Sequence, residues 1–202
     1  MRVQALIIAI VSLFPSFVRA SEFNQDTPGW IGVVLGQHFT GKINHLAFCP
    51  IVEFRSGYRV SEQFALRMDL GTAITKITNP DRDSFKGAGL LMGHLSLVLL
   101  HTPELSPGFR LNLGGTLGVW FTAIWGDNLL NVQQGSKTKY LEEISMSYGV
   151  VAGLEWNLSS CFSLTSEVRY NLAMVKFGGS QYNTGGLTLL LGFQYRLKAT
   201  NL

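Results

Sequence analysis

The sequence has few charges and, after its first residues, no long apolar run. Charged residues make up 14% of the 202 residues, against about 25% in average soluble domains, and hydrophobic residues make up 47%. Beyond residue 20, no apolar stretch reaches the roughly 18 residues that a membrane-spanning helix needs. Together with the 22 glycines, this composition favours strands that place one face in lipid.

Several chemical signatures are also missing. No basic cluster exists that would serve nucleic-acid binding, so no nucleic-acid partner is expected. No glycine-rich phosphate loop in the context of a strand and a helix, paired-cysteine motif or metal-binding histidine spacing occurs, so neither a cofactor nor a metal is expected. Cys49 and Cys161 are expected at opposite ends of the fold, where they would stay free thiols.

The chain begins like an exported protein. Arg2 precedes the apolar run ALIIAIVSLF, and the small residue Ala20 marks a cleavage site, so residues 1–20 are predicted to be a signal peptide. The formal net charge of +3 falls to +1 once Arg2 and Arg19 leave with it. Residues 21–202 then suit a single domain.

Segments of about ten residues alternate between large apolar and small or polar side chains, which is the period of a strand. In FRLNLGGTLGVWF the odd positions are mostly Leu, Val and Phe, and the even positions mostly Arg, Asn, Thr and Gly. The predicted strands are 29–39, 46–60, 64–77, 87–101, 109–121, 144–158, 162–173 and 186–197.

The connections between these strands differ in length. Those at 61–63, 102–108 and 159–161 are mostly short, and the first one on the other side, 40–45, is brief as well. The remaining connections are longer and polar, at 78–86, 122–143 and 174–185. Short turns on one side and longer loops on the other are typical of bacterial outer-membrane barrels, with the turns in the periplasm and the loops outside the cell.

The composition of the two faces of the predicted strands indicates which face meets lipid and which faces the interior of the barrel. One face is almost entirely Leu, Val, Ile and aromatic, whereas the other carries ten charges among Gly, Ser, Thr and Asn. We therefore predict an all-β, eight-stranded antiparallel up-and-down transmembrane barrel with a polar, charged lumen, in which arginines fork onto carboxylates. The predicted lumen charges are Glu53, Arg55, Arg59, Arg67, Asp69, Arg110, Glu155, Glu167, Arg169 and Arg196.

Aromatic side chains are predicted to form two girdles on the lipid face, where ring edges meet lipid headgroups. One girdle lies at the short-turn ends of the strands and the other at the opposite rim. The first comprises Tyr58, Phe64, Phe109, Trp156, Phe162 and Tyr195, and the second Phe39, Phe48 and Phe121.

Two stretches resemble a known family. The hairpin EFRSGYRVSEQFALRMDLG, 53–71, and the closing strand LTLLLGFQYRL, 187–197, are similar to small barrels of the OmpA/OmpX-like superfamily. The resemblance implies a place in the Gram-negative outer membrane, contact with outer-membrane lipid and lipopolysaccharide, and assembly by the barrel assembly machinery. The family's chains usually end on Phe or Trp, whereas here Lys198 to Leu202 follow the strand.

The fold and resemblance favour a non-enzymatic outer-membrane protein, with a role in envelope integrity or in surface-loop contact with an extracellular or host ligand, as in adhesion. The first alternative is a narrow, porin-like channel for ions or small solutes. Another is a soluble lipocalin-like binder. The oligomeric state stays open.

A third alternative is a lipid A-modifying enzyme, because His94-Leu95-Ser96 is similar to the His-x-Ser pair of outer-membrane lipid A deacylases. Ser96 would be the nucleophile and His94 its base. We expect instead that both face the lumen, with no acid at a matching place on the next strand, and serve as hydrogen-bonding groups there. His38 and His45 are expected to be loop histidines, and Glu142 and Glu143 a solvated rim, rather than metal ligands.

Overall fold

The structure is a computed structural model that describes residues 29–40, 49–77, 88–131, 136–177 and 180–197. The predicted signal peptide, the residues after 197, His45 and Phe48 lie outside this part of the chain. Within it, no helix is long and apolar enough to cross a membrane. The strands are β1 (Gly29–Thr40), β2 (Pro50–Arg59), β3 (Phe64–Lys76), β4 (Gly89–His101), β5 (Glu104–Ser106), β6 (Phe109–Asn131), β7 (Ser136–Asn157), β8 (Phe162–Phe177), β9 (Ser180–Asn183) and β10 (Gly186–Arg196).

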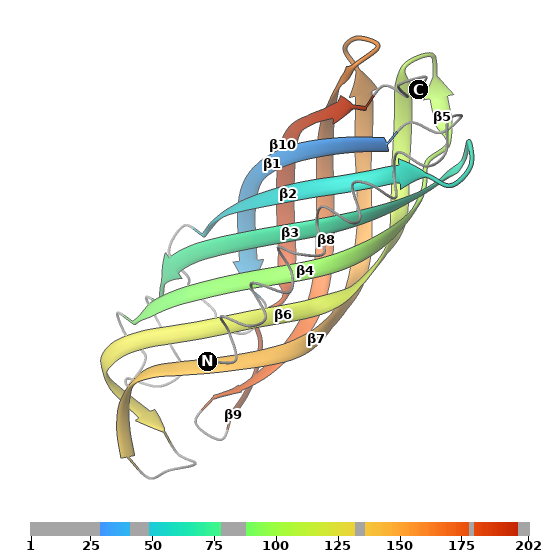
Figure 1. Ribbon diagram of the computed structural model, residues 1–202. Coiled ribbons are helices and arrows are strands. Elements are labelled where there is room, and N and C mark those ends of the chain that lie inside the picture. The colour runs from blue at the N-terminus through green and yellow to red at the C-terminus, as the bar shows by residue number, and fades with distance from the viewer. Residues whose placement is uncertain (1–28, 41–48, 78–87, 132–135, 178–179, 198–202) are drawn as a thin grey trace, which may run out of the picture.

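Eight of these strands form a closed antiparallel barrel (Figure 1). Each long strand pairs with the next one along the chain, and β10 pairs with both β8 and β1, which closes the sheet. In the described ranges, the short β5 pairs with β6 alone, and β9 with β8 alone. The predicted all-β up-and-down barrel is therefore confirmed, and closure leaves none of the eight strands at an open edge along the middle of the barrel.

Two of the predicted long loops are wrong, because strands occupy much of them. Where a loop was expected at 122–143, β6 and β7 continue as a two-stranded ribbon to the pair Asn131 and Ser136, with a register shift between Trp125 and Leu129. Where one was expected at 174–185, β8 continues to Phe177 and pairs with β9. A ribbon satisfies its backbone hydrogen bonds without an apolar face, so a polar composition does not exclude strands.

The two ends of the barrel differ in shape. At one end, the short-turn end, tight turns join β2 to β3 and β7 to β8, and β5 with Gly108 (φ +80°) leads from β4 into β6. At the other, the long-loop end, the pairing of β7 with β8 stops at Ser147 and Ala173. Beyond that point the β6–β7 ribbon and the β8–β9 hairpin project separately (Figure 1).

Large apolar side chains cover the outside of the barrel, as the alternation predicts. Leu117, Met146, Val150, Leu191 and Phe193 are each more than half exposed. Among the predicted girdle residues, Trp156, Phe162 and Tyr195 are exposed at the short-turn end, where the Phe162 and Tyr195 rings meet edge to face with centroids 5.1 Å apart. Phe39 is exposed at the long-loop end. The barrel is thus apolar outside and charged inside.

Candidate functional site

Three groups of interacting side chains lie at different depths along the axis of the lumen. The mouth cluster, at the short-turn end, comprises Arg59, Glu104, Arg110, Glu155 and Arg196. The central network comprises Glu53, Arg55, Arg67, Asp69, His94, Glu167 and Arg169. The apolar plug, toward the long-loop end, comprises Val34, Cys49, Ile51, Ala73, Ile77, Ala88, Leu90, Met92, Trp120, Ile124, Ala173, Val175 and Leu190.

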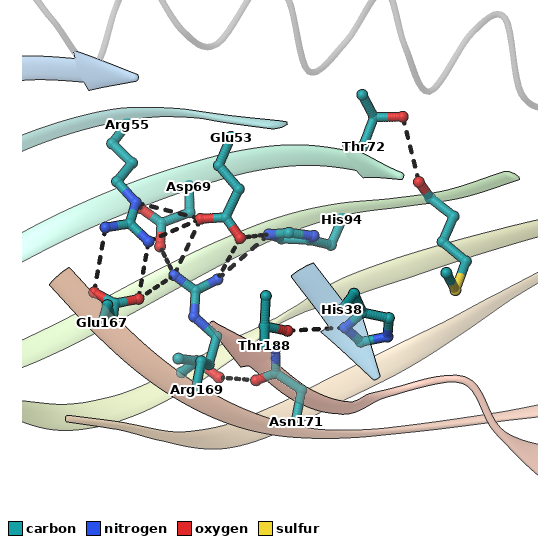
Figure 2. A network of polar contacts seen from close by, with 12 residues as sticks. His38, Glu53, Arg55, Asp69, Thr72, His94, Glu167, Arg169, Asn171 and Thr188 are labelled. Carbon is teal, nitrogen blue, oxygen red and sulfur yellow. Dashed lines mark hydrogen bonds and ion pairs between the residues drawn. The ribbon is translucent and has the colours of Figure 1, made fainter. Parts of the chain in front are cut away.

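Three strands supply the charges of the central network, each with an acid and an arginine two residues apart. Residues i and i+2 of a strand point to the same face, so each pair faces the lumen together. The pairs are Glu53 with Arg55 on β2, Arg67 with Asp69 on β3, and Glu167 with Arg169 on β8. Arg55 also lies beside Asp69 in the β2–β3 register. The closed barrel brings β8 across to this hairpin (Figure 2).

Glu167 is the centre of the network, because it contacts all three arginines. Its Oε1 lies 2.9 Å from Arg55 Nη2 and 2.7 Å from Arg169 Nη2, and its Oε2 lies 2.7 Å from Arg67 Nη1. Glu53 accepts from Arg55 at 2.9 Å and from Arg169 at 3.3 Å, and Asp69 accepts from Arg67 at 2.8 Å and also from Arg169. Each arginine therefore bridges carboxylates on different strands, as Figure 2 shows for Arg55 and Arg169.

The central network is balanced in charge and dry. Three guanidinium groups face three carboxylates, and none of the six side chains is more than 1% exposed. Burial of an unpaired charge costs several kcal/mol, so this layer requires the match between acids and arginines. One ion pair lacks hydrogen-bond geometry, because Arg67 Nε lies 2.8 Å from Asp69 Oδ1 but its N–H does not point at that oxygen.

His94 joins the network to the plug. Its Nε2 lies 3.3 Å from Glu53 Oε1, and its ring stacks on Trp120 with centroids 5.1 Å apart and planes 9° apart. The lack of a side chain at Gly71 makes room for it, since a Cβ there would lie 2.2 Å from His94 Cε1 and 2.8 Å from Glu53 Cγ. A glycine is therefore required where the charged layer meets the aromatic one.

His38 is not a loop histidine, contrary to the sequence prediction. It is buried in the lumen, where Nδ1 lies 2.8 Å from Thr188 Oγ1 and Nε2 lies 3.1 Å from the Thr184 carbonyl oxygen (Figure 2). Its ring centroid is 5.5 Å from that of Trp120. The alternation of β1 contained this signal, because Val34, Gly36 and His38 share the face opposite Val33 and Leu35.

Ser96 is buried and faces the lumen, as expected for a hydrogen-bonding group rather than a lipid-accessible nucleophile. The next strand, β6, places Gly118 beside Ser96 and Trp120 beside His94, so no acid stands at a matching place there, as expected. The preceding strand does supply one, because Asp69 lies beside Ser96 in the β3–β4 register. Asp69 contacts arginines, however, and the site is sealed from lipid by the barrel wall. Ser96, at 1% exposure, is therefore not in contact with lipid.

The mouth cluster has a different composition. Glu155 Oε1 accepts from Arg196 at 3.1 Å, and its Oε2 lies 3.7 Å from Arg59 Nη2, which reaches it across the lumen. Arg196 also donates to Asn157 Oδ1, and Arg59 donates to Thr102 Oγ1 at 3.0 Å. Within the described part of the chain, Arg110 has one ion pair, with the exposed Glu104 at 3.5 Å. The ten predicted lumen charges thus divide into two separate clusters.

The remaining candidate residues lie apart from these clusters. Cys49 and Cys161 are free, the first within the apolar plug and the second in the turn between β7 and β8. Glu142 and Glu143 lie on β7 opposite Ala123 and Thr122. Among the described residues, no group of His, Cys, Asp or Glu is arranged to hold a metal ion.

Solved structures share this architecture. Neisserial surface protein A is 14% identical, with a TM-score of 0.58 over 85% of this chain and 97% of that one. The fold is that of a small outer-membrane barrel. A major outer membrane protein from Thermus thermophilus is 13% identical, with a TM-score of 0.57 over 85% of this chain and 99% of that one.

The attachment invasion locus protein Ail of Yersinia pestis, in complex with the heparin analogue sucrose octasulfate, shares this outer-membrane barrel fold. It is 14% identical, with a TM-score of 0.50 over 85% of this chain and 97% of that one. No protein-family model and no curated protein matches the sequence. At these identities the likeness establishes the barrel fold and leaves function to the residues of this chain.

Sequence reasoning missed the apolar plug and the role of Trp120. The signal was present in the alternation, since Val34, Ile51, Leu90, Met92 and Trp120 have lumen parity and are large and apolar. They were hidden because lipid-facing residues on the same strands are also apolar. Hydrophobicity alone cannot separate the two faces where both are apolar.

Proposed function

We propose that this protein is an integral outer-membrane barrel with a non-enzymatic, structural role in the envelope, and that its long-loop end presents connections to the cell exterior. The observation that carries the proposal is the distribution of side chains. Large apolar residues are exposed all round the outer wall, whereas the six charges of the central network are almost fully buried. A soluble barrel with that outer surface would aggregate in water.

The dimensions of the strands support a membrane-spanning barrel. A transmembrane strand needs about 9–11 tilted residues, and β2 and β10 have 10 and 11. The exposed rings of Trp156, Phe162 and Tyr195 at the short-turn end, and of Phe39 at the other, stand where lipid headgroups would meet the barrel. The short turns would then lie in the periplasm, as in other bacterial barrels.

The filled lumen supports a scaffold rather than a channel. The guanidinium groups of Arg55, Arg67 and Arg169 occupy the middle of the barrel, and Trp120 and its apolar neighbours occupy the next layer. An ion would have to displace paired charges and then cross a dry apolar layer. A structural network that joins β2, β3 and β8 is the role that these contacts support.

The position of the long-loop end supports a role in surface contact. The Ail structure holds a heparin analogue, so a barrel of this fold can have a sulfated sugar as a ligand. For this chain, we propose that the connections at the long-loop end, including 41–48 and 78–87, contact an extracellular or host ligand. Their sequences carry both signs of charge, with Lys42, Arg82 and Lys86 against Asp81 and Asp83.

Cell fractionation followed by electrophoresis with and without boiling tests the proposed location. We expect a band that needs detergent for extraction from the outer membrane and migrates faster when unboiled, because a closed barrel resists unfolding by cold detergent. A protein released in soluble form, with no change in mobility on boiling, would overturn the proposal. That outcome would favour the soluble binding barrel.

Planar-bilayer recording and lipid A mass spectrometry separate the scaffold from its two alternatives. We expect no stable single-channel conductance from the wild-type protein, because the network and the plug fill the lumen. We also expect lipid A from cells expressing the wild-type protein and the Ser96→Ala variant to be the same. A conductance that is reproducible, or a change in lipid A that disappears with Ser96→Ala, would replace the scaffold with a channel or an enzyme.

A further inference from the structure

We propose that the mouth cluster is a binding site for a phosphate group. Arg59 on β2, Arg110 on β6 and Arg196 on β10 bring three guanidinium groups to the short-turn end of the lumen around one buried carboxylate, Glu155. Arg59 lies close enough to Arg110 and Arg196 for their charges to repel it. The inference concerns the lumen only and does not depend on the proposed function.

Arg110 has the least satisfied guanidinium group of the cluster. Its Nη2 donates to Glu104 Oε2 at 3.5 Å, which is the outer limit of a hydrogen bond, and Glu104 is itself 46% exposed. Its Nε is buried and has no partner among the described residues. A buried donor without an acceptor carries a desolvation cost, which an oxygen of a bound anion would remove.

Glu155 forms a hydrogen bond with one of the other two arginines, Arg196, but not with Arg59. It lies 3.1 Å from Arg196 but 3.7 Å from Arg59, a distance beyond hydrogen bonding. With Glu104 and Glu155 ionised, the cluster carries three positive and two negative charges. The net positive charge and the incomplete contacts make one more acceptor energetically favourable.

The cluster is open enough for a small anion to reach it. The side chains of Arg59, Arg110 and Arg196 are 13%, 20% and 23% exposed, whereas the arginines of the central network are at most 1% exposed. Water can therefore enter the mouth but not the centre. An anion can exchange with water at the mouth without being fully desolvated.

A phosphate group fits the donors better than a single carboxylate does. Each guanidinium group is a planar fork that can donate two parallel hydrogen bonds to oxygens of one anion. The three guanidinium groups come from three strands, β2, β6 and β10, and a tetrahedral anion offers acceptors in several directions. The phosphate could be free inorganic phosphate or the headgroup of a phospholipid at the rim of the barrel.

Side-chain NMR of the arginine Nε–H groups tests the proposal in the full-length folded protein, in uncharged maltoside micelles without phosphate. Inorganic phosphate is added at constant ionic strength, with chloride as the balancing anion. We expect saturable shifts of the Nε resonances of Arg59, Arg110 and Arg196, and unchanged resonances of the three arginines in the central network. A second titration uses micelles that contain phosphatidylglycerol.

Two variants with opposite expected effects sharpen the test. Arg110→Gln should weaken phosphate binding about tenfold, as for the loss of a charge-assisted hydrogen bond, whereas Glu155→Gln should strengthen it by removal of the competing carboxylate. Lys76→Gln is the matched control, because it removes one exposed positive charge at the long-loop end and should leave the affinity unchanged. Heat-shift electrophoresis checks that each variant is folded.

The outcomes are distinct. Saturable shifts with inorganic phosphate identify a site for the free anion, and shifts that appear only with phosphatidylglycerol identify the headgroup as the source of the same chemistry. The proposal is overturned if the shifts do not saturate, if chloride alone produces them, or if Arg110→Gln and Lys76→Gln behave alike. In those cases the arginines at the mouth interact only with their protein partners and with water.

Discussion

The central network and the mouth cluster are built from the same side chains, but in different proportions. Three arginines face three carboxylates in the centre, where no side chain of the six is more than 1% exposed. Three arginines face one buried and one exposed carboxylate at the mouth, where water is in reach. The comparison shows how burial sets the ratio of arginines to carboxylates. Charges that are shielded from water must be paired in equal numbers, whereas charges that water can solvate need not be.

The plug explains why the central layer must be dry. Trp120, Leu90 and Met92 fill the lumen between the network and the long-loop end, so water has no polar path from that side. His94 ends the charged layer by pairing with Glu53 and stacking on Trp120. Toward the mouth, a second buried apolar cluster of Ala65, Val98, Leu100 and Val151 adjoins the network, with Val98 beside Arg67 and Val151 beside Arg169 in the strand registers.

The largest loss of stability is expected from Glu167→Gln, which removes one negative charge from the charge-balanced central network. The change leaves one buried positive charge uncompensated among the three arginines that Glu167 contacts. Loss of one partner of a buried ion pair costs about 3–5 kcal/mol. Urea unfolding of the refolded protein in detergent measures this cost as a lower midpoint.

Glu155→Gln is the matched control for that variant, since it removes the same group from the mouth. We expect a smaller cost there than for Glu167→Gln, because the partners Arg59 and Arg196 are partly exposed and water can solvate them once the carboxylate is gone. The double variant Arg67→Gln with Glu167→Gln restores the balance and should recover part of the loss, as a coupling between the two positions. Equal costs for Glu167→Gln and Glu155→Gln would mean that burial does not distinguish the two clusters.

A smaller effect is expected where the central network meets the plug. A methyl group at Gly71 would approach His94 Cε1 to 2.2 Å and Glu53 Cγ to 2.8 Å, so Gly71→Ala should cost about 1–3 kcal/mol through crowding. Gly93→Ala is the control, because its nearest neighbour would lie 3.7 Å away, and it should stay within about 0.5 kcal/mol of the wild type. Urea midpoints of the two variants measure these costs. A small loss of stability in Gly71→Ala would show that His94 can move to accommodate the methyl group.

The sequence was sufficient to predict the barrel, because lipid imposes a period of two on every strand. All eight predicted strands overlap an observed one, and the ten predicted lumen charges lie on the inner face. The continuations of the strands beyond Trp125 and Met174 were missed, since these segments are short and rich in Gly, Asn, Ser and Lys, which hides the alternation. The alternation of apolar and polar residues shows which face a side chain is on, but only in strands whose two faces have different surroundings.

The division of the site into layers could not be predicted. Parity places Arg59 and Arg67 on the same face, but it does not give their depth in the lumen. Depth depends on the stagger between strands, which sets which residues of β2 and β8 meet across the barrel. The contact of Arg55 with Glu167, 112 residues away along the chain, follows from that stagger and from closure between β10 and β1.

Salt provides a finer test of the difference between the clusters. Arg59→Gln should cost about 1 kcal/mol or less at low ionic strength, and less still in concentrated sodium chloride, because salt screens partly exposed charges. Arg67→Gln, in the dry layer, should cost several kcal/mol at either concentration. Urea midpoints of both variants at low and high salt measure this, and a strong salt dependence for Arg67→Gln would show that water reaches the central network.

The smallest expected effect is a pH-dependent change in the β5–β6 turn, and it depends on Glu104, which lies outside the eight barrel strands. The Gly108 N–H, which donates to Glu104 Oε1 at 3.0 Å, and secondly the charge of Arg110 hold the pKa of this carboxyl below its usual range. Because the folded pKa is lowered, the contribution of ionised Glu104 to the β5–β6 turn is complete above the usual glutamate pKa of about 4.3. It is lost as the pH falls below that value through the lowered pKa.

The amide resonance and hydrogen exchange of Gly108 report on this contact. We expect both to change as the pH falls through the lowered pKa, and Glu104→Gln to remove that pH dependence. Glu62→Gln, which removes an exposed carboxylate from the β2–β3 turn, should leave it intact. If Gly108 keeps its pH dependence in Glu104→Gln, another acid governs the turn.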